Sequence, residues 1–289
     1  MQQDSRLELH TDGLSFGEGP RWHEGALHLS DIADGRVLRI PEPGKPETLT
    51  ELDGRPSGLG WLPDGRLLVV SMLDHQLLRL DPGGLTQVAD LSELCGGDAN
   101  DMVVDADGRA YISNIGFEIE GISFDKLEIR ATNLIRVDPD GSVHRAASEM
   151  MSPNGMAISP DGRRLIVGES SAMALTVFDI AEDGALSGRR NFARLEGGAT
   201  VDGMCLDAEG CVWVASPPTH EFLRVREGGE IADRVSLGER RAIACVLGGP
   251  ERRTLFCITN GYMSIADAAR DRSGRVESMS VEVPGAGRP

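Results

Sequence analysis

A short pattern recurs six times along this chain and limits what the chain can fold into. Each copy is an apolar stretch that, except in the last copy, ends at a turn with glycine: EGPRWHEG (18–25), SGLGWLPDG (57–65), NDMVVDADG (100–108), NGMAISPDG (154–162), DGMCLDAEG (202–210) and a degraded IACVLGGPE (243–251). Successive copies begin 39, 43, 54, 48 and 41 residues apart. A repeat of this length with strand patterns is typical of a β-propeller.

Further strand patterns follow each turn, and they define the unit. Alternating apolar segments such as 36–40, 76–81 and 174–180 predict additional strands, so that each unit offers about four, A to D. One such sheet cannot bury both faces, whereas six packed around an axis can. The predicted fold class is therefore all-β, a six-bladed β-propeller with four-stranded antiparallel blades around a central channel, in a single domain over 1–289. The segment Arg6–His10 is expected to complete the last blade.

Composition narrows the classes of partner. The formal net charge of −17 argues against nucleic acid, whose phosphates are neutralised by Lys and Arg. No apolar run approaches the roughly 20 residues of a membrane helix, and the first residues lack the pattern of a signal peptide. The five cysteines show no CxxC spacing, and four lie in apolar strand patterns, so they are expected to be free thiols. A cytoplasmic protein without a membrane or nucleic-acid partner is expected.

The first residue of each copy occupies an equivalent place in the predicted ring. Strand A of a propeller lines the channel, so pseudo-symmetry places these residues around the channel mouth. They are Glu18, Ser57, Asn100, Asn154, Asp202 and Ile243. Two carboxylates and two amides that converge on one axis suit a hard divalent cation, because carboxylates neutralise the ion and amides add oxygen without repulsion. The competing interpretation is that these polar residues only hydrate the channel or bind neighbouring backbone.

Several of these segments resemble one known family. GEGPRW (17–22), the pair Asn100-Asp101, SPNGMAISPDG (152–162) and DGMCLDAEGCVWVA (202–215) resemble the SMP-30/gluconolactonase/LRE family of six-bladed propellers, which is related to diisopropylfluorophosphatase and paraoxonase-like enzymes. The resemblance implies one divalent cation held by Glu18, Asn154 and Asp202, with Asn100 as a fourth ligand or a substrate contact. Ca²⁺ is the expected ion, and Zn²⁺, Mn²⁺, Mg²⁺ and Fe²⁺ are the alternatives.

Three positions bear on how far the resemblance extends. Sugar lactonases of the family often carry an arginine two residues before the Asn-Asp pair, where this chain has Asp98. A family glutamate in a loop of the third blade falls on Glu118. An aspartate that builds a second calcium site in some relatives is replaced by Cys205, so no second site is predicted.

The longest departure from the repeat is FEIEGISFDKLEIRAT at 117–132. A loop of this length is often a lid or a binding segment. The alternative is an elongated hairpin that extends two strands of the third blade.

Lactone hydrolysis is the chemistry that the resemblance implies. A cation polarises the carbonyl oxygen, and water attacks the carbonyl carbon. Asp202 is the predicted general base, because one of its oxygens can hold the cation while the other accepts a proton. Alternatively, Asp202 is a ligand only.

Substrate choice is expected to depend on the mouth. The predicted substrate-binding residues are Met72, His75, Asp98, Asn100, Asn114, Phe117, Glu118, His220 and Tyr262. His220 is either a proton carrier or an incidental loop residue. The predicted function is a metal-dependent lactonase that opens a sugar-derived or other small lactone. The alternatives are a phosphotriesterase or phosphofluoridate hydrolase on the same propeller, and a non-catalytic ligand-sensing propeller. The sequence predicts no oligomeric state.

Overall fold

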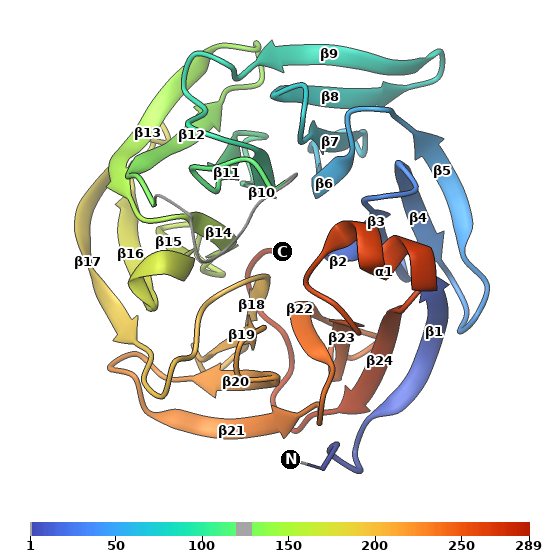
Figure 1. The fold of residues 1–289 in the computed structure, drawn as a ribbon. Coiled ribbons are helices and arrows are strands. Elements are labelled where there is room, and N and C mark those ends of the chain that lie inside the picture. Colours follow the sequence, from blue (N-terminus) through green and yellow to red (C-terminus); the bar gives the residue numbers. More distant parts are fainter. Residues whose placement is uncertain (1, 120–128) are drawn as a thin grey trace.

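Six four-stranded antiparallel sheets form a closed ring in the computed structural model, which describes residues 2–119 and 129–289 (Figure 1). Blade one comprises β2 (Gly17–His23), β3 (Ala26–Asp31), β4 (Arg36–Ile40) and β5 (Glu47–Glu51). Blade two comprises β6 (Pro56–Trp61), β7 (Leu67–Ser71), β8 (Gln76–Asp81) and β9 (Gly84–Asp90). Blade three comprises β10 (Ala99–Val104), β11 (Ala110–Asn114), β12 (Thr132–Val137) and β13 (Val143–Met150).

The remaining blades follow the same order. Blade four comprises β14 (Pro153–Ile158), β15 (Arg164–Glu169), β16 (Ala174–Ile180) and β17 (Leu186–Arg194), with a short 3-10 turn, η2 (Ser170–Ala172). Blade five comprises β18 (Met204–Leu206), β19 (Val212–Ser216), β20 (Glu221–Val225) and β21 (Ile231–Ser236). Blade six comprises β22 (Arg241–Gly248), β23 (Thr254–Asn260), β24 (Gly274–Ser280) and β1 (Glu8–Leu14). The predicted six-bladed propeller is confirmed.

The ring is closed by its first strand. β1 pairs antiparallel with β24, with Glu8 opposite Ser278 and Leu14 opposite Gly274. The N-terminal strand therefore completes the last blade as predicted, although it begins two residues later than expected and continues to Leu14. Closure of this kind removes the free sheet edge that an open ring would expose.

The core lies between neighbouring blades. One cluster joins Ile166 and Leu175 of blade four to Met204 and Val212 of blade five, and all four side chains are buried. Successive side chains of a strand point to opposite faces of the sheet. Each blade therefore has two apolar faces, and each face is covered by a neighbouring blade. In the described part of the chain, no helix is long and apolar enough to cross a membrane.

Two features of the fold were not predicted. A short helix, α1 (Ile265–Asp271), follows β23, and Ser264 caps it by accepting a hydrogen bond from the Asp267 amide. Beyond β24 the chain crosses the channel near the ends of the first strands of blades four and five, where Arg288 bridges to Ile158 and Gly285 bridges to Asp207. Its last residue lies at the centre of the ring (Figure 1). There Arg288 exchanges backbone hydrogen bonds of 2.9 and 2.7 Å with Ile158.

Candidate metal centre at the channel mouth

The pairing of the first two strands is irregular at the repeated first residue of the pattern. The register shifts occur between Glu18 and Arg21, Pro56 and Leu59, Ala99 and Met102, Pro153 and Met156, and Ala242 and Ala244. In blade five the regular pairing begins at Met204, two residues after Asp202. Such bulges re-aim a side chain out of the pleat. They occur at five of the six ring residues, namely Glu18, Ser57, Asn100, Asn154 and Ile243.

Glycines beside the ring residues let adjacent first strands come close together. A Cβ on Gly155 would lie 2.6 Å from the Asp202 carbonyl oxygen, and a Cβ on Gly58 would lie 2.5 Å from the Met102 amide nitrogen. Both contacts are too short for any other residue, so the glycines are required for this approach. They bring Asn154 next to Asp202, and Ser57 next to the Asn100-Asp101 pair.

Glu18 and Asp202 influence one another electrostatically across the mouth. Burial and the nearby charge of Asp202 raise the pKa of Glu18 well above its usual range, while the Gly19 amide, 2.9 Å from Glu18 Oε2, opposes the shift. Burial raises the pKa of Asp202 to about 7, a hydrogen bond from the Asn154 side chain opposes this, and the charge of Asp101 adds to it. Two carboxylates that repel each other in a partly desolvated site favour proton or cation binding.

No ion pair among the described residues includes Glu18 or Asp202. In this they differ from Asp101, another acidic residue of the channel. Asp101 lies 2.6 Å from Arg21 Nη2, and both side chains are buried. Within residues 2–119 and 129–289 there is no group of three or more His, Cys, Asp or Glu side chains that could hold a metal. A cation at this mouth would therefore be held by two carboxylates together with amide oxygens, and the unneutralised pair fits that need.

Asn100 is the fourth oxygen-bearing side chain of the set. It is 5% exposed, and its Oδ1 accepts a hydrogen bond of 3.0 Å from Ser57 Oγ. An amide oxygen has two lone pairs, so this bond fixes the side chain and leaves one lone pair for a further contact.

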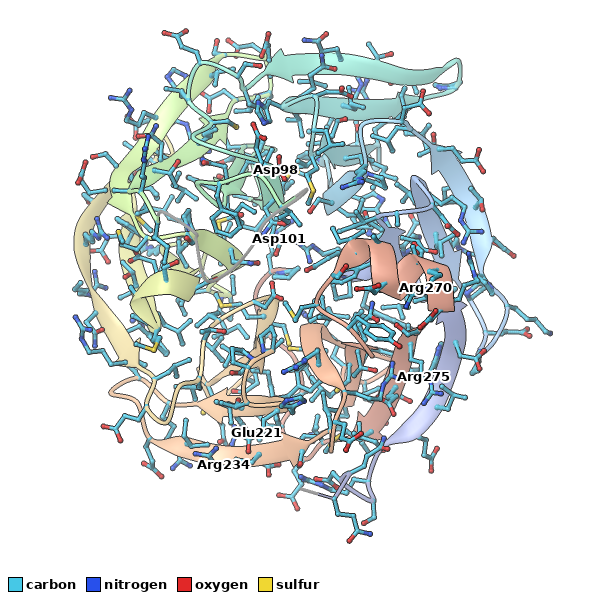
Figure 2. All side chains as sticks on the ribbon, in the orientation of Figure 1. Asp98, Asp101, Glu221, Arg234, Arg270 and Arg275 are labelled. Carbon is cyan, nitrogen blue, oxygen red and sulfur yellow. The ribbon has the colours of Figure 1, made fainter. Side chains whose placement is uncertain are left out.

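The predicted substrate residues of blade three have structural contacts. Asp98 and Asp101 lie on the inner side of this blade (Figure 2). Asp98 is buried, its Oδ2 accepts from the Ile119 amide at 2.8 Å, and its own amide donates to the Phe117 carbonyl at 2.9 Å. Asn114 is fully buried, with its amide bound to Gly96 and Asn133. Asp98 therefore fixes the start of the insert, and Asn114 has no exposed surface.

The described ends of the insert do not continue the strands of blade three. β11 ends at Asn114 and β12 begins at Thr132, so neither strand extends into 117–119 or 129–131. Instead, Ile119 packs against an apolar cluster that contains Met72 of blade two and Ile243 of blade six. Glu118 is exposed, and Phe117 is partly buried. The rest of the insert, 120–128, lies outside the described residues, so the choice between lid and hairpin stays open.

The predicted substrate residues outside blade three differ in how exposed they are. Met72 is buried at 1% exposure, and His75 is partly buried, with a positive φ of 51°. Tyr262 is 39% exposed, and its hydroxyl donates to Asp271 at the end of α1.

His220 is held by two partners, one of which was missed in the sequence. His220 Nδ1 lies 2.9 Å from the Arg240 carbonyl oxygen, and His220 Nε2 lies 2.8 Å from Arg241 Nη1. Arg241 precedes the sixth ring residue by two positions. The repeat could have pointed to Arg241, because it stands two positions before a ring residue. The sixth copy is degraded, however, and its place in the repeat was harder to recognise.

The fold and this mouth define a class, a six-bladed propeller whose channel entrance is lined with carboxylate and amide oxygen. The model of the SMP-30/Gluconolactonase/LRE-like region matches residues 16–261. The chain belongs to this family.

The chain is similar to lactonases in sequence and to solved propellers in structure. A 6-deoxy-6-sulfogluconolactonase of Pseudomonas putida is 29% identical, over 95% of this chain and 94% of its own. Pentonolactonase XacC of Haloferax volcanii is 28% identical, over 85% of this chain and 82% of its own. The crystal structure of regucalcin from Agrobacterium tumefaciens, described as a calcium-binding protein, superposes with a TM-score of 0.77 at 22% identity and covers 96% of this chain and 93% of its own.

Proposed function

We propose that this chain is a divalent-cation-dependent hydrolase that opens a small lactone. The observation that carries the proposal is the pair of carboxylates at the mouth, Glu18 and Asp202, which repel each other and have no ion-pair partner among the described residues. Buried carboxylates without a cationic partner are unfavourable unless a ligand compensates them. Relatives named as lactonases support the reaction class, and the calcium-binding regucalcin supports the cofactor class.

Four side chains would hold the ion in this proposal, namely Glu18, Asn100, Asn154 and Asp202. When bound, a divalent cation supplies a Lewis acid that polarises the lactone carbonyl and stabilises negative charge on its oxygen. Ca²⁺ is the proposed ion, because all four ligands are oxygen donors.

The remaining chemistry belongs to the protein's own groups. Asp202 acts as the general base and accepts the proton of the attacking water on one carboxylate oxygen. Asn154 orients that carboxylate through its hydrogen bond, and Ser57 holds Asn100 in place. The apolar cluster around Ile243 and Ile119 excludes water from the side of the mouth where the ring has no oxygen donor.

The test is hydrolysis of a lactone panel by chelator-treated protein, with each divalent ion restored separately. The panel includes gluconolactone, a pentonolactone and unsubstituted δ-valerolactone, and acid release is followed with a pH indicator. Turnover that disappears on chelation and returns with one ion supports the proposal. Turnover unaffected by chelation contradicts the cation dependence. Hydrolysis of a phosphotriester but of no lactone contradicts the reaction class.

A further inference from the structure

A second tier of residues lies outside the ring, two positions before each ring residue. By the repeat these residues occupy equivalent places at the mouth end of the six first strands. They are Phe16, Arg55, Asp98, Ser152, Thr200 and Arg241. A substrate whose carbonyl lies at the ring would meet this tier with its more distant substituents, so the tier bears on substrate choice.

The guanidinium of Arg241 is held on one side only. Its Nη1 lies 2.8 Å from His220 Nε2 and 3.3 Å from the Pro217 carbonyl oxygen. Pro217 and His220 belong to the connection between β19 and β20, which opens on the mouth face. These two contacts use Nη1, and neither Nε nor Nη2 of Arg241 forms a hydrogen bond or ion pair with any residue of 2–119 or 129–289.

His220 is arranged to orient this guanidinium. Its Nδ1 faces the Arg240 carbonyl oxygen, which can only accept, so Nδ1 carries the hydrogen and Nε2 is the acceptor for Arg241. His220 also adopts a φ of 59°, a conformation that side-chain-bearing residues rarely take.

The two atoms of Arg241 without a described partner, Nε and Nη2, are the ones that other arginines of this protein use to bind carboxylates. Arg79 uses Nε and Nη2 to bind the Asp81 carboxylate, at 2.9 and 2.8 Å. Arg66 uses the same two atoms on Asp64. This pair of parallel N–H groups matches the two oxygens of a carboxylate, a sulfonate or a phosphate.

We propose that Arg241 binds an oxyanion substituent of the substrate, so that the lactone opened at this mouth is an acidic one. The inference rests on the proposed function, because the ring is taken to receive the reacting carbonyl. A cationic contact in the second tier offsets the repulsion between an acidic substrate and a chain with a net charge of −17.

The experiment compares lactones that differ only in the oxyanion. One pair is 5-oxotetrahydrofuran-2-carboxylate and its carboxamide, and the other is 6-deoxy-6-sulfogluconolactone and gluconolactone. With the active ion present, we expect kcat/KM to favour the acidic member of at least one pair by about 10- to 100-fold, the range for a charged hydrogen-bonded contact. The pair with the larger ratio distinguishes a carboxylate from a sulfonate.

Variants assign this preference to Arg241. In Arg241→Gln the acidic-to-neutral ratio should fall to within about threefold of unity, mainly through KM, because the contact is made by the bound substrate. His220→Ala should lower the ratio less, since it loosens the guanidinium without removing it. Arg226→Gln is the matched control, because Arg226 forms an exposed ion pair with Glu230 at the opposite face of the neighbouring blade five. If Arg241→Gln does not fold, Arg241→Lys should fold and keep a weaker preference.

A binding measurement separates this inference from the proposed function. The ketone 3-oxocyclopentane-1-carboxylate has no ester bond, so calorimetry on the full chain reports its binding without turnover. Binding that requires Arg241, with no lactone hydrolysed, would contradict the proposed function and leave the oxyanion contact standing. Lactone hydrolysis with equal rates for both members of each pair, unchanged in Arg241→Gln, would overturn the inference.

Discussion

Two kinds of carboxylate lie within the same channel, and the difference between them separates structure from function. Asp101 forms an ion pair of 2.6 Å with the buried Arg21, and its Oδ1 also accepts from the Met102 amide. Glu18 and Asp202, at the mouth, have no ion-pair partner among the described residues. Burial raises the pKa of both, and the charge of Asp202 raises the pKa of Glu18 further. The ion pair of Asp101 and Arg21 holds strands of different blades together, whereas the carboxylates of Glu18 and Asp202 are available to a ligand.

The same contrast holds for the rest of the propeller. Asp207 is buried in blade five, and Arg224 Nε lies 2.7 Å from it. Asp31 is buried in blade one and pairs with Arg36. Both of these carboxylates lie away from the mouth and have an arginine partner. Substitutions at the two kinds of position should therefore have opposite consequences for stability.

The largest effect is expected at Asp202. Asp202→Asn keeps the shape and removes the charge, so lactone turnover should fall by about 1,000-fold or more, together with loss of the bound ion. The chelated variant should be at least as stable as the chelated wild type, because an unpaired carboxylate has been removed. Turnover rates, metal content and thermal unfolding check this, and undiminished turnover would refute the assignment of Asp202.

Asp101 should behave in the opposite way. Asp101→Ala removes the carboxylate partner of the buried Arg21 and leaves it with backbone carbonyl acceptors only, so the free energy of unfolding should fall by about 3–5 kcal/mol in the presence or absence of metal. Urea denaturation measures the loss. Glu18→Gln is the control, since it should destabilise the metal-free protein little or not at all. Equal destabilisation by both substitutions would remove the distinction between paired and unpaired carboxylates.

The pH dependence of stability offers a third comparison, in chelator throughout. The pKa of Asp202 is raised to about 7 in the folded chain from an ordinary value of 3.8, so the folded state binds more protons than the unfolded state between those values. Asp202 therefore stabilises the fold at low pH, and this contribution is lost as pH rises from about 4 to 7. The stability of wild type relative to Asp202→Asn should decline over that range. A constant difference would show that Asp202 is not perturbed.

The smallest effect is expected at Gly155, which lets the first strand of blade four come close to Asp202 of blade five. Gly155→Ala places a methyl group against the Asp202 carbonyl and should destabilise the protein by about 1–3 kcal/mol, with weaker ion binding. Gly83→Ala, where the added methyl group meets nothing within 4 Å, is the matched control. Unfolding curves and ion titrations of the two variants test whether this approach shapes the mouth. If the two variants behave alike, it does not.

Much of the fold could be predicted because the repeat shows directly in the residues. The segments 36–40, 76–81 and 174–180 coincide with β4, β8 and β16, since their apolar alternation and flanking turns are local signals. Equivalence of the repeats also predicted which six residues would share the mouth. It could not predict the bulges that aim them, because a bulge depends on the pairing of two strands.

The contacts around the ring were harder to predict. Asn114 was expected to meet substrate, yet its burial is decided by Gly96 and Asn133, which come from different connections. Arg241 was missed because its significance comes from His220, which lies 21 positions earlier in the chain. The short helix α1 has a weak local signal, and the crossing of the channel near Arg288 depends on bonds to blade four. Such features come from tertiary contacts.

The most direct test of the account is a calorimetric titration of Ca²⁺ into the chelator-treated protein, followed by thermal unfolding. We expect one ion per chain in the wild type with an increase in Tm, and no binding in Asp202→Asn or Glu18→Gln. A single-site isotherm that persists unchanged in both variants would contradict it, because the unpaired carboxylates of the mouth would then not be the cation site.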